Sequence, residues 1–242
     1  MTTTAPTKVA PLSPRTRIKI CGLTREQDVD AAVAAGADAV GFVLYDKSPR
    51  YVNPPRAAEL ARRLPPFVTP VLLFVNEESS KIIAAYDHLM LGMIQFHGDE
   101  SPGQCEAVAR ACKCPWLRAA RIPLNDTPAF DLLEFTASNA RAQAILLDAH
   151  VEGFGGGGKA FKWSLLPQNV NAHLVLSGGL TPANVTEGIL QVRPRGLSLA
   201  VDVSSGVEAD GPGGSTLKGI KDPQKIHQFV AAVRAADQQL AE

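Results

Sequence analysis

From Arg17 onward the chain alternates between two kinds of segment, and this alternation constrains the fold more than any other feature. Short apolar, β-branched runs are followed by longer stretches, rich in alanine, glutamate and arginine, with helical spacing. The eight apolar runs cover residues 18–21, 39–44, 70–75, 93–96, 116–120, 144–147, 174–176 and 197–201. Continuously apolar runs are typical of parallel strands covered on both faces. Eight strand–helix units without a linker between them predict a single α/β domain, a closed (β/α)8 TIM barrel.

The alternative architecture is an open, doubly wound sheet. Its dinucleotide-binding form needs the pattern G-x-G-x-x-G after the first strand, whereas this turn reads Cys21-Gly22-Leu23-Thr24. A length of 242 residues suits one α/β barrel. We predict a catalytic barrel over residues 17–242, preceded by a disordered extension over residues 1–16. The extension has no acidic residue, so a transit peptide is the weaker alternative.

Helix starts are marked by short polar side chains that can accept a hydrogen bond from a backbone N–H in the first turn. The predicted caps are Thr24 with Gln27, Ser101 with Gln104, Thr181-Pro182 and Asp222-Pro223. In the last helix an apolar stripe, formed by Ile226, Phe229, Val230 and Val233, predicts the buried face. Two further helices are less clearly marked: the segment after Asp126 is expected to be helical through Ser138, and residues 161–166 are expected to form only a short helix.

Charge and cysteine content narrow the classes of partner. The 24 basic residues balance the 24 acidic ones, so the chain carries no overall charge that attracts nucleic acid or anionic membranes. No apolar run approaches the ~20 residues that span a bilayer. The four cysteines form no spaced disulfide framework, and Cys112-Lys113-Cys114 is one residue short of the usual C-x-x-C spacing. We therefore expect a cytoplasmic protein with no metal site.

Polar residues follow the predicted strands, at the end of a barrel where catalytic groups lie. They are Cys21, the Ser48-Pro49-Arg50 loop, His97, Arg121, Asp148, Ser177-Gly178-Gly179 and Asp202. A carboxyl at the barrel mouth, such as Asp148, can act as a general acid if burial raises its pKa. A cysteine ahead of a helix N-terminus, such as Cys21, can become a thiolate. Lys19 should share the orientation of Cys21 and needs a partner such as Asp202.

Three glycine-bearing loops lie late in the chain, over residues 155–158, at Gly178-Gly179 and at Ser204-Ser205-Gly206. Glycine allows the backbone to approach an anion closely, and barrels commonly bind phosphate after strands seven and eight. We therefore predict a phosphate site there.

These motifs together resemble the phosphoribosylanthranilate isomerase family. The similar segments run in order from Lys19-Ile20-Cys21-Gly22-Leu23-Thr24 through Gly41-Phe42-Val43, Ser48-Pro49-Arg50-Tyr51-Val52, Val75-Asn76, Gln95-Phe96-His97-Gly98, Leu146-Leu147-Asp148, Ser177-Gly178-Gly179-Leu180-Thr181-Pro182, Asn184-Val185, Asp202-Val203-Ser204-Ser205-Gly206-Val207-Glu208, Gly219, and Lys221-Asp222. One such motif is weak evidence, but this many in collinear order are specific.

The resemblance implies an Amadori rearrangement in tryptophan biosynthesis, without metal or cofactor. The phosphosugar substrate would be N-(5-phosphoribosyl)anthranilate, and the protein a monomer or a homodimer. Asp148 would be the general acid and Cys21 the general base, while Arg50 would bind the anthranilate carboxylate. His97 and Asp202 are further candidates for contact with the substrate. The phosphate would be bound by Gly156, Gly157, Gly178, Gly179, Ser204 and Ser205.

The sequence departs from the family pattern in one loop, where Gly157 replaces a threonine and Lys162 replaces an acid. A glycine-rich insertion over residues 210–216 also lengthens the segment before the last helix. The alternative enzymes are another phosphosugar barrel, either an indole-glycerol-phosphate synthase with Lys19 as its acid or a ribulose-phosphate epimerase, and the histidine-pathway isomerase. A phosphate-binding barrel without catalysis is the alternative from another class.

Overall fold

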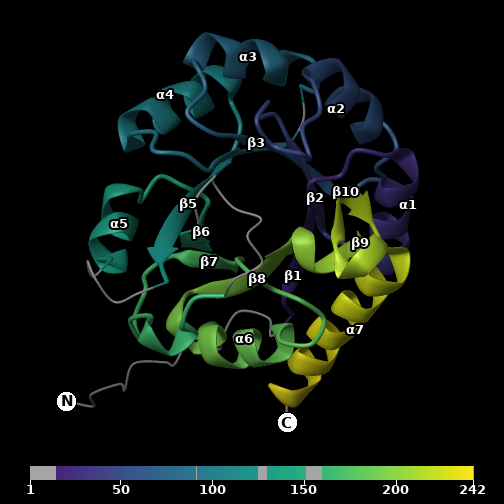
Figure 1. Ribbon diagram of the computed structural model, residues 1–242. Helices are drawn as coiled ribbons and strands as arrows, with labels where there is room; N and C mark the ends of the chain where they lie inside the picture. The colour runs from purple at the N-terminus through teal and green to yellow at the C-terminus, as the bar shows by residue number, and fades with distance from the viewer. Residues whose placement is uncertain (1–14, 91, 125–129, 151–159, 242) are drawn as a thin grey trace, which may run out of the picture.

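The computed structural model describes residues 15–90, 92–124, 130–150 and 160–241, and its eight predicted strands close into one parallel barrel (Figure 1). The strands are β1 (Arg17–Cys21), β2 (Ala39–Val43), β3 (Thr69–Phe74), β4 (Met93–Phe96), β5 (Trp116–Pro123), β6 (Ala144–His150), β7 (His173–Leu176) and β8 (Ser198–Val203). Parallel pairing of β8 with β1 closes the barrel. The predicted TIM barrel is confirmed, and the open sheet is excluded.

Helices surround the barrel in a ring (Figure 1). They are α1 (Glu26–Ala35), α2 (Pro54–Ala61), α3 (Ser79–Asp87), α4 (Pro102–Cys112), α5 (Leu132–Ser138), α6 (Val185–Val192) and α7 (Pro223–Gln239), with the 3₁₀ helices η1 (Trp163–Leu165), η2 (Arg193–Arg195), η3 (Ser205–Val207) and η4 (Pro212–Gly214). The strands follow a period of two: Ile18 and Ile20 belong to the core under the helices, while Cys21 belongs to a separate cluster inside the barrel.

Two of the predicted helix caps are confirmed. The side chain of Ser101 accepts a hydrogen bond from Gln104 N at 3.3 Å, and that of Asp222 accepts one from Gln224 N at 2.7 Å. The predicted apolar stripe of α7 is also buried. The capping prediction for Thr24 is wrong, because α1 begins at Glu26 and the Thr24 hydroxyl donates instead to the carbonyl of Gly219 at 2.8 Å.

The predicted helix start at Thr181 is also wrong. The helix α6 begins at Val185, and residues 181–184 form a turn in which the side chain of Asn184 accepts a hydrogen bond from Thr181 N at 2.8 Å. A proline after a polar residue is equally compatible with a turn, which is the reason why the pattern misplaced the start.

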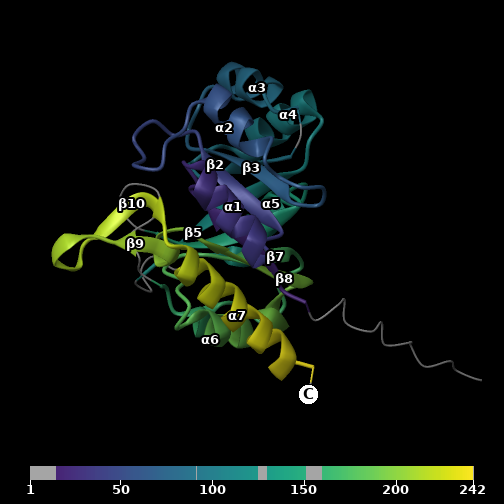
Figure 2. The same ribbon diagram turned by 90° about the vertical axis from the view of Figure 1, so that its right-hand side faces the viewer.

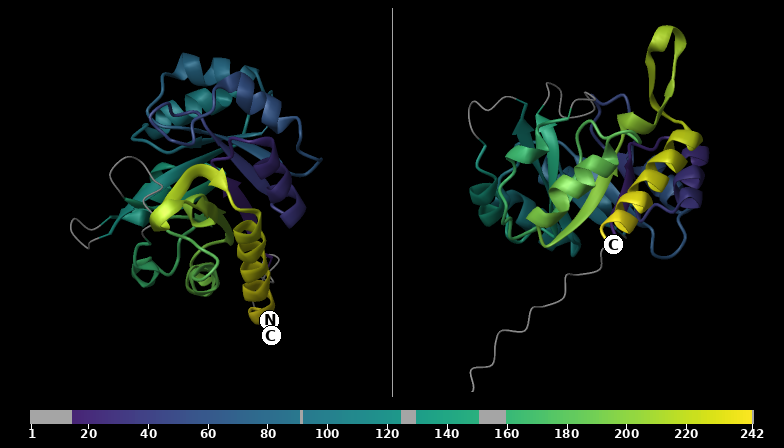
Figure 3. Two further views of the ribbon diagram at one scale, coloured as in Figure 1. Left: turned by 45° about the vertical axis from the view of Figure 1, so that its right-hand side comes forward. Right: turned by 90° about the horizontal axis from the view of Figure 1, so that it is seen from below.

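The glycine-rich insertion forms the tip of a β-hairpin, built from β9 (Glu208–Asp210) and the antiparallel β10 (Thr216–Lys221). The hairpin connects β8 with α7 and projects beyond the barrel on the side where α7 begins (Figures 2 and 3). Because β8 leads directly into it, the hairpin rises from the carboxyl end of the strands.

The first strand begins at Arg17, and the residue before it already contacts the rest of the barrel domain. Thr16 is buried, its backbone N–H donates to the carboxylate of Asp237 on α7, and its carbonyl accepts from Arg234 at 3.0 Å. The rest of the predicted extension, residues 1–14, lies outside the described residues. No helix in the described part of the chain is long and apolar enough to cross a membrane.

Candidate active site

The barrel brings the predicted catalytic and binding residues to one end. Cys21 ends β1, Asp148 lies near the end of β6 and Asp202 near the end of β8, while Arg50 and His97 follow β2 and β4. All five are buried, with exposed fractions between 4% and 7%. Buried polar groups need partners inside the protein, so their contacts define what each can do.

Lys19 is paired as the sequence predicts. Its ammonium donates to Asp202 Oδ1 at 2.9 Å, and the two residues are register partners on β1 and β8. Burial lowers the pKa of Lys19, but the charges of Asp202 and Cys21 outweigh it and leave the pKa above its ordinary value. Lys19 is therefore a cation at neutral pH, which makes it unsuited to Schiff-base chemistry and suited to electrostatic support of Cys21.

Burial raises the pKa of the Cys21 thiol, and Lys19 opposes this shift without cancelling it. The helix whose N-terminus was expected to favour the thiolate, α1, begins five positions after Cys21, at Glu26. Lys19 provides a stabilising charge. Gly41 on β2 leaves space for this pair, since a Cβ there would lie 2.5 Å from Cys21 Sγ and 3.1 Å from Lys19 Cε.

Asp148 is held by His97 and by its own chain. His97 Nε2 lies 2.9 Å from Asp148 Oδ2, and Ala149 N donates to Oδ1 at 3.0 Å. His97 Nδ1 in turn lies 2.9 Å from Gln95 Nε2. Because an amide NH₂ group only donates, the imidazole carries its proton on Nε2 in this orientation and donates it to an ionised Asp148.

The opposite orientation of the Gln95 amide supports a protonated Asp148. Gln95 Oε1 is buried and has no hydrogen-bond partner among the described residues. If the amide turned over, Oε1 would accept from His97 Nδ1–H, and Nε2 would be free to accept a proton from Asp148. In either orientation of the Gln95 amide, both ring nitrogens of His97 hydrogen-bond to groups of the protein. The predicted contact of His97 with the substrate therefore stays a prediction.

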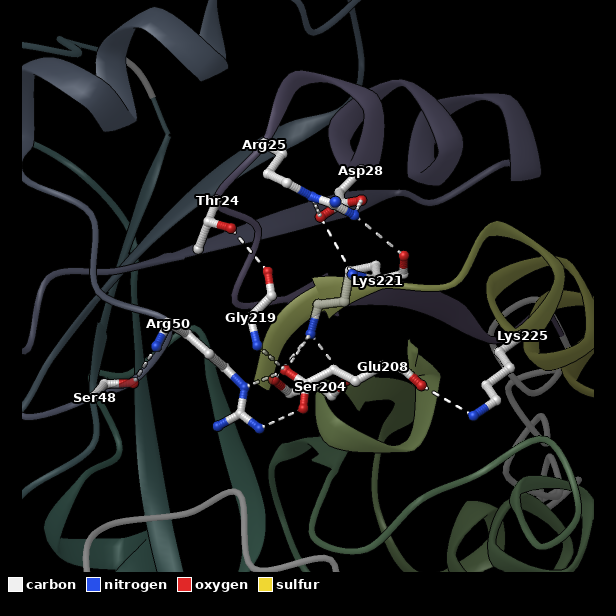
Figure 4. A network of polar contacts seen from close by, with 10 residues as sticks. All are labelled: Thr24, Arg25, Asp28, Ser48, Arg50, Ser204, Glu208, Gly219, Lys221 and Lys225. Atoms are coloured by element: carbon white, nitrogen blue, oxygen red, sulfur yellow. Dashed lines mark hydrogen bonds and ion pairs between the residues drawn. The ribbon is translucent and has the colours of Figure 1, made fainter. Parts of the chain in front are cut away.

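Arg50 makes a bidentate ion pair with Glu208 (Figure 4), a contact that the sequence analysis missed. Arg50 Nε lies 2.7 Å from Glu208 Oε1, and Nη2 lies 2.8 Å from Oε2. The side chain of Arg50 passes over Gly22, where φ is +76° and a Cβ would lie 2.5 Å from Arg50 Cδ. Glu208 and Lys221 stand in motifs that the sequence analysis singled out, but no local signal showed that they meet Arg50.

The loops after β7 and β8 lie against each other. A Cβ at Gly206 would overlap the carbonyl oxygen of Leu180, so the two backbones are in direct contact there. Gly178 has φ +76° and lies against Asp148, whose Oδ1 would be 2.8 Å from a Cβ at that position. The residues of the predicted phosphate site within these two adjacent loops are Gly178, Gly179, Ser204 and Ser205. Gly156 and Gly157 lie outside the described residues.

Metal ligation finds no support within residues 15–90, 92–124, 130–150 and 160–241, which contain no group of three or more His, Cys, Asp or Glu side chains that could hold an ion. Cys112 is the last residue of α4. Burial raises the pKa of Cys112 to about 11, so this thiol stays protonated at neutral pH. Lys162, one of the departures from the family pattern, is exposed at the start of η1.

Comparisons with known proteins agree with the barrel fold. The family model for N-(5'-phosphoribosyl)anthranilate (PRA) isomerase matches residues 18–232. A protein of that name from Methylibium petroleiphilum is 60% identical over 227 residues, which cover 94% of this chain and 98% of the relative.

Two solved structures are also similar. One is a phosphoribosyl anthranilate isomerase in complex with reduced 1-(o-carboxyphenylamino)-1-deoxyribulose 5-phosphate, with 37% identity, a TM-score of 0.73 and coverage of 91% of this chain and 99% of that one. The other, described as monomers generated from the dimeric enzyme of Thermotoga maritima, has 36% identity, a TM-score of 0.71 and the same coverage.

Proposed function

The chain belongs to the N-(5'-phosphoribosyl)anthranilate isomerase family, and we propose that Asp148 and Cys21 are the general acid and general base of its reaction. The enzyme isomerises N-(5-phosphoribosyl)anthranilate to 1-(2-carboxyphenylamino)-1-deoxyribulose 5-phosphate in tryptophan biosynthesis. The observation that carries the proposal is the presence of two buried proton-transfer groups, each with its own charged or polar partner, at the carboxyl end of the same barrel.

Asp148 opens the ring. The protonated carboxyl donates its proton to the furanose oxygen, the bond between that oxygen and C1′ breaks, and the nitrogen lone pair forms the C1′–N double bond of the iminium. His97 can support this step, because its Nε2 lies 2.9 Å from Asp148 Oδ2: it donates to the carboxylate when the Gln95 amide is oriented as in the structure, and it would accept from the acid if that amide turned over. A positioned acid of this kind typically contributes ~10²–10⁴-fold in rate.

Cys21 takes the proton from C2′. The cationic iminium makes this proton acidic, so a modest base is sufficient, and Lys19 stabilises the thiolate that abstracts it. The electron pair of the broken C–H bond forms the C1′–C2′ double bond of the enolamine. To reach the ketone, the enolamine gains a proton at C1′ and loses one from the 2′ hydroxyl. Return of one proton from Cys21 and uptake of one by Asp148 restore both groups.

The two anionic ends of the substrate bind at different loops. Arg50 binds the anthranilate carboxylate, and backbone N–H groups at Gly178, Gly179, Ser204 and Ser205 bind the phosphate. Gly156 and Gly157 are proposed to complete the phosphate site. Asp202, which holds Lys19 through one oxygen, is proposed to contact the substrate hydroxyls through the other.

No cofactor is needed for these proton transfers, and none is proposed. The partner is the phosphosugar substrate, with no proposed role for nucleic acid or membrane. The chain is proposed to act as a monomer or as a homodimer, the second by analogy with the Thermotoga maritima relative, which is described as dimeric.

The test follows the anthranilate-type fluorescence of substrate generated in situ, with purified protein and EDTA. The expected result is rapid loss of fluorescence in the presence of EDTA. No loss of fluorescence with folded protein would contradict the proposal. It would favour the histidine-pathway aminoaldose or another phosphosugar as substrate, or a barrel that only binds its ligand. Turnover assays with those substrates and direct binding measurements distinguish these alternatives.

A further inference from the structure

Three buried charged side chains form one cluster beside the barrel mouth (Figure 4). Arg50 comes from the loop after β2, Glu208 from β9 and Lys221 from β10. Their side chains are 9%, 0% and 0% exposed. Glu208 Oε1 accepts hydrogen bonds from Arg50 Nε at 2.7 Å, from Gly219 N at 2.8 Å and from Lys221 Nζ at 3.4 Å, while Oε2 accepts from Arg50 Nη2 at 2.8 Å.

The ion pair leaves one edge of the guanidinium for a ligand. Arginine has five N–H donors in a fixed plane, and Glu208 takes one on Nε and one on Nη2 of Arg50. None of the hydrogen bonds among the described residues uses Nη1. The outer edge, formed by Nη1 and the second N–H of Nη2, is the one that can bind a carboxylate through two parallel hydrogen bonds. Glu208 therefore sets which edge of Arg50 the substrate meets.

Lys221 determines the charge of the cluster. The charges of Arg50 and Glu208 alone would cancel, and a neutral pair attracts an anion only weakly. Burial lowers the pKa of Lys221 to about 8, against the opposing effect of Glu208, so the ammonium is mostly charged at pH 7. The cluster then carries a net charge of about +1, which suits an anionic substrate group.

Lys221 also connects the cluster to the proposed phosphate loop. Its ammonium donates to the carbonyl of Ser204 at 2.9 Å and lies 3.4 Å from the Ser204 hydroxyl. The strand that carries Lys221 is fixed by Thr24, which donates to Gly219 O at 2.8 Å, and by Asp28, which accepts from Lys221 N at 3.3 Å. The same lysine thus touches the elements proposed to hold the two anionic ends of the substrate.

We propose that Glu208 and Lys221 are positioning residues for recognition of the substrate's anthranilate carboxylate: Glu208 orients the guanidinium of Arg50, and Lys221 keeps the cluster cationic and holds Ser204 in register with it. The inference rests on the proposed function, in which Arg50 binds that carboxylate. It goes further by assigning selectivity for the carboxylate to two residues that do not touch it.

The test compares two ligands by isothermal titration calorimetry. One is reduced 1-(2-carboxyphenylamino)-1-deoxyribulose 5-phosphate, and the other is the same molecule without the carboxylate. The dissociation constant of the ligand without the carboxylate, divided by that of the ligand with it, measures how much the carboxylate contributes to binding. We expect a ratio of about 10–100 for the unmodified protein, the range of a charge-assisted hydrogen-bonded pair. A ratio near one there would contradict the proposed role of Arg50, independently of Glu208.

Glu208→Gln distinguishes an orienting role of Glu208 from a purely electrostatic one, because the two roles predict opposite changes in the ratio of dissociation constants. The substitution raises the net charge of the cluster, so electrostatic attraction alone predicts a larger ratio. Orientation predicts a smaller one, because the glutamine NH₂ group would face an N–H of Arg50 and release the guanidinium. We expect the ratio to fall to below about one third of its original value. An unchanged or larger ratio in folded protein overturns the positioning role of Glu208.

Lys221→Met tests the second residue. We expect a reduced ratio together with weaker binding of both ligands, since Ser204 loses its support, and an unchanged ratio overturns the role of Lys221. If Glu208→Gln fails to fold, the double variant Glu208→Gln/Lys221→Met retains the charge of Arg50 and removes the buried ammonium of Lys221, so that only one buried cation of the cluster lacks its carboxylate. Its ratio is expected to fall as well, and a retained ratio would overturn the proposal. Asp210→Asn, on the same hairpin and paired with Lys225, is the control that keeps the original ratio.

Discussion

At the scale of single residues, Cys21 depends on two opposed neighbours. Lys19 lowers the pKa of its thiol, whereas burial and Asp202 raise it. Since the thiolate of Cys21 is the proposed base, activity should rise with pH as this group ionises, and each neighbour should shift the pH of that rise in a definite direction.

We therefore predict opposite shifts for two substitutions. In Lys19→Met the alkaline rise of kcat moves to higher pH, because the thiolate loses its cation. In Asp202→Asn the rise moves to lower pH, because a competing anion is removed. The measurement is kcat against pH for the two variants and the unmodified protein, with circular dichroism to establish that each is folded. Shifts in the same direction would show that the titrating group is not Cys21.

The residue scale is also where sequence reasoning succeeded and failed most visibly. The period of two along β1 correctly placed Lys19 beside Cys21 and gave it Asp202 as partner. The ion pair of Arg50 with Glu208 spans 158 positions in the chain, and no local pattern reports such a contact. The role of Gln95 was missed for a different reason: it lies only two positions from His97, but the sequence does not show which way the side chains of Gln95 and His97 point.

At the scale of elements, the turn after β1 shapes the site through Gly22. Its φ of +76° disfavours any residue with a Cβ, and its missing side chain leaves room for Arg50. Gly36 at the end of α1 has φ +92° but nothing within 4 Å of a Cβ. A methyl group at Gly22 would therefore displace Arg50, whereas one at Gly36 would displace nothing, and both would carry the same backbone cost of about 1–2 kcal/mol.

This contrast predicts different outcomes for the two alanine variants. Both Gly22→Ala and Gly36→Ala should lose about 1–2 kcal/mol of unfolding free energy, measured by urea denaturation. Only Gly22→Ala should also raise KM, by about tenfold or more, because the Cβ displaces Arg50. Equal KM values for the two variants would mean that the path of Arg50 over Gly22 has no part in substrate binding.

Elements were predictable where local chemistry decides them. The eight strands were found from apolar runs, because both faces of a barrel strand are covered and each run is therefore continuous. The caps at Ser101 and Asp222 were found because a cap uses groups within one turn. Thr24 was misread because its hydroxyl has a tertiary partner, Gly219, that lies 195 positions away.

At the scale of the whole molecule, hydrogen bonds and an ion pair stabilise the barrel where its first strand meets its last helix. The carboxylate of Asp237 on α7 accepts the backbone N–H of buried Thr16 at 2.8 and 2.9 Å, and it pairs with Arg193 at 3.1 Å. These contacts join the start of the barrel to α7 and to the segment between α6 and β8, far from the proposed active site at the opposite end of the strands.

Asp237→Ala should therefore reduce stability and leave catalysis unchanged. It removes the acceptor of a buried N–H group, which costs about 1–3 kcal/mol, or roughly 2–12 °C in Tm for a chain of this size. Asp30→Ala, which breaks the exposed pair with Arg63, is the control and should cost less than about 1 kcal/mol. Calorimetry measures both. A loss of kcat/KM in Asp237→Ala at a temperature where it is folded would contradict the separation of the two ends.

We propose two buried groups, an acid on β6 and a base on β1, as the carriers of the proton transfers. The most direct test measures kcat and the affinity for the reduced product analogue in Asp148→Asn and Cys21→Ala, with Cys105→Ala as the control for loss of a buried thiol. We predict that kcat falls by at least ~10²-fold in each of the first two variants, while analogue affinity stays within about threefold. Near-normal kcat in either variant would contradict the account and reassign that proton transfer to another group.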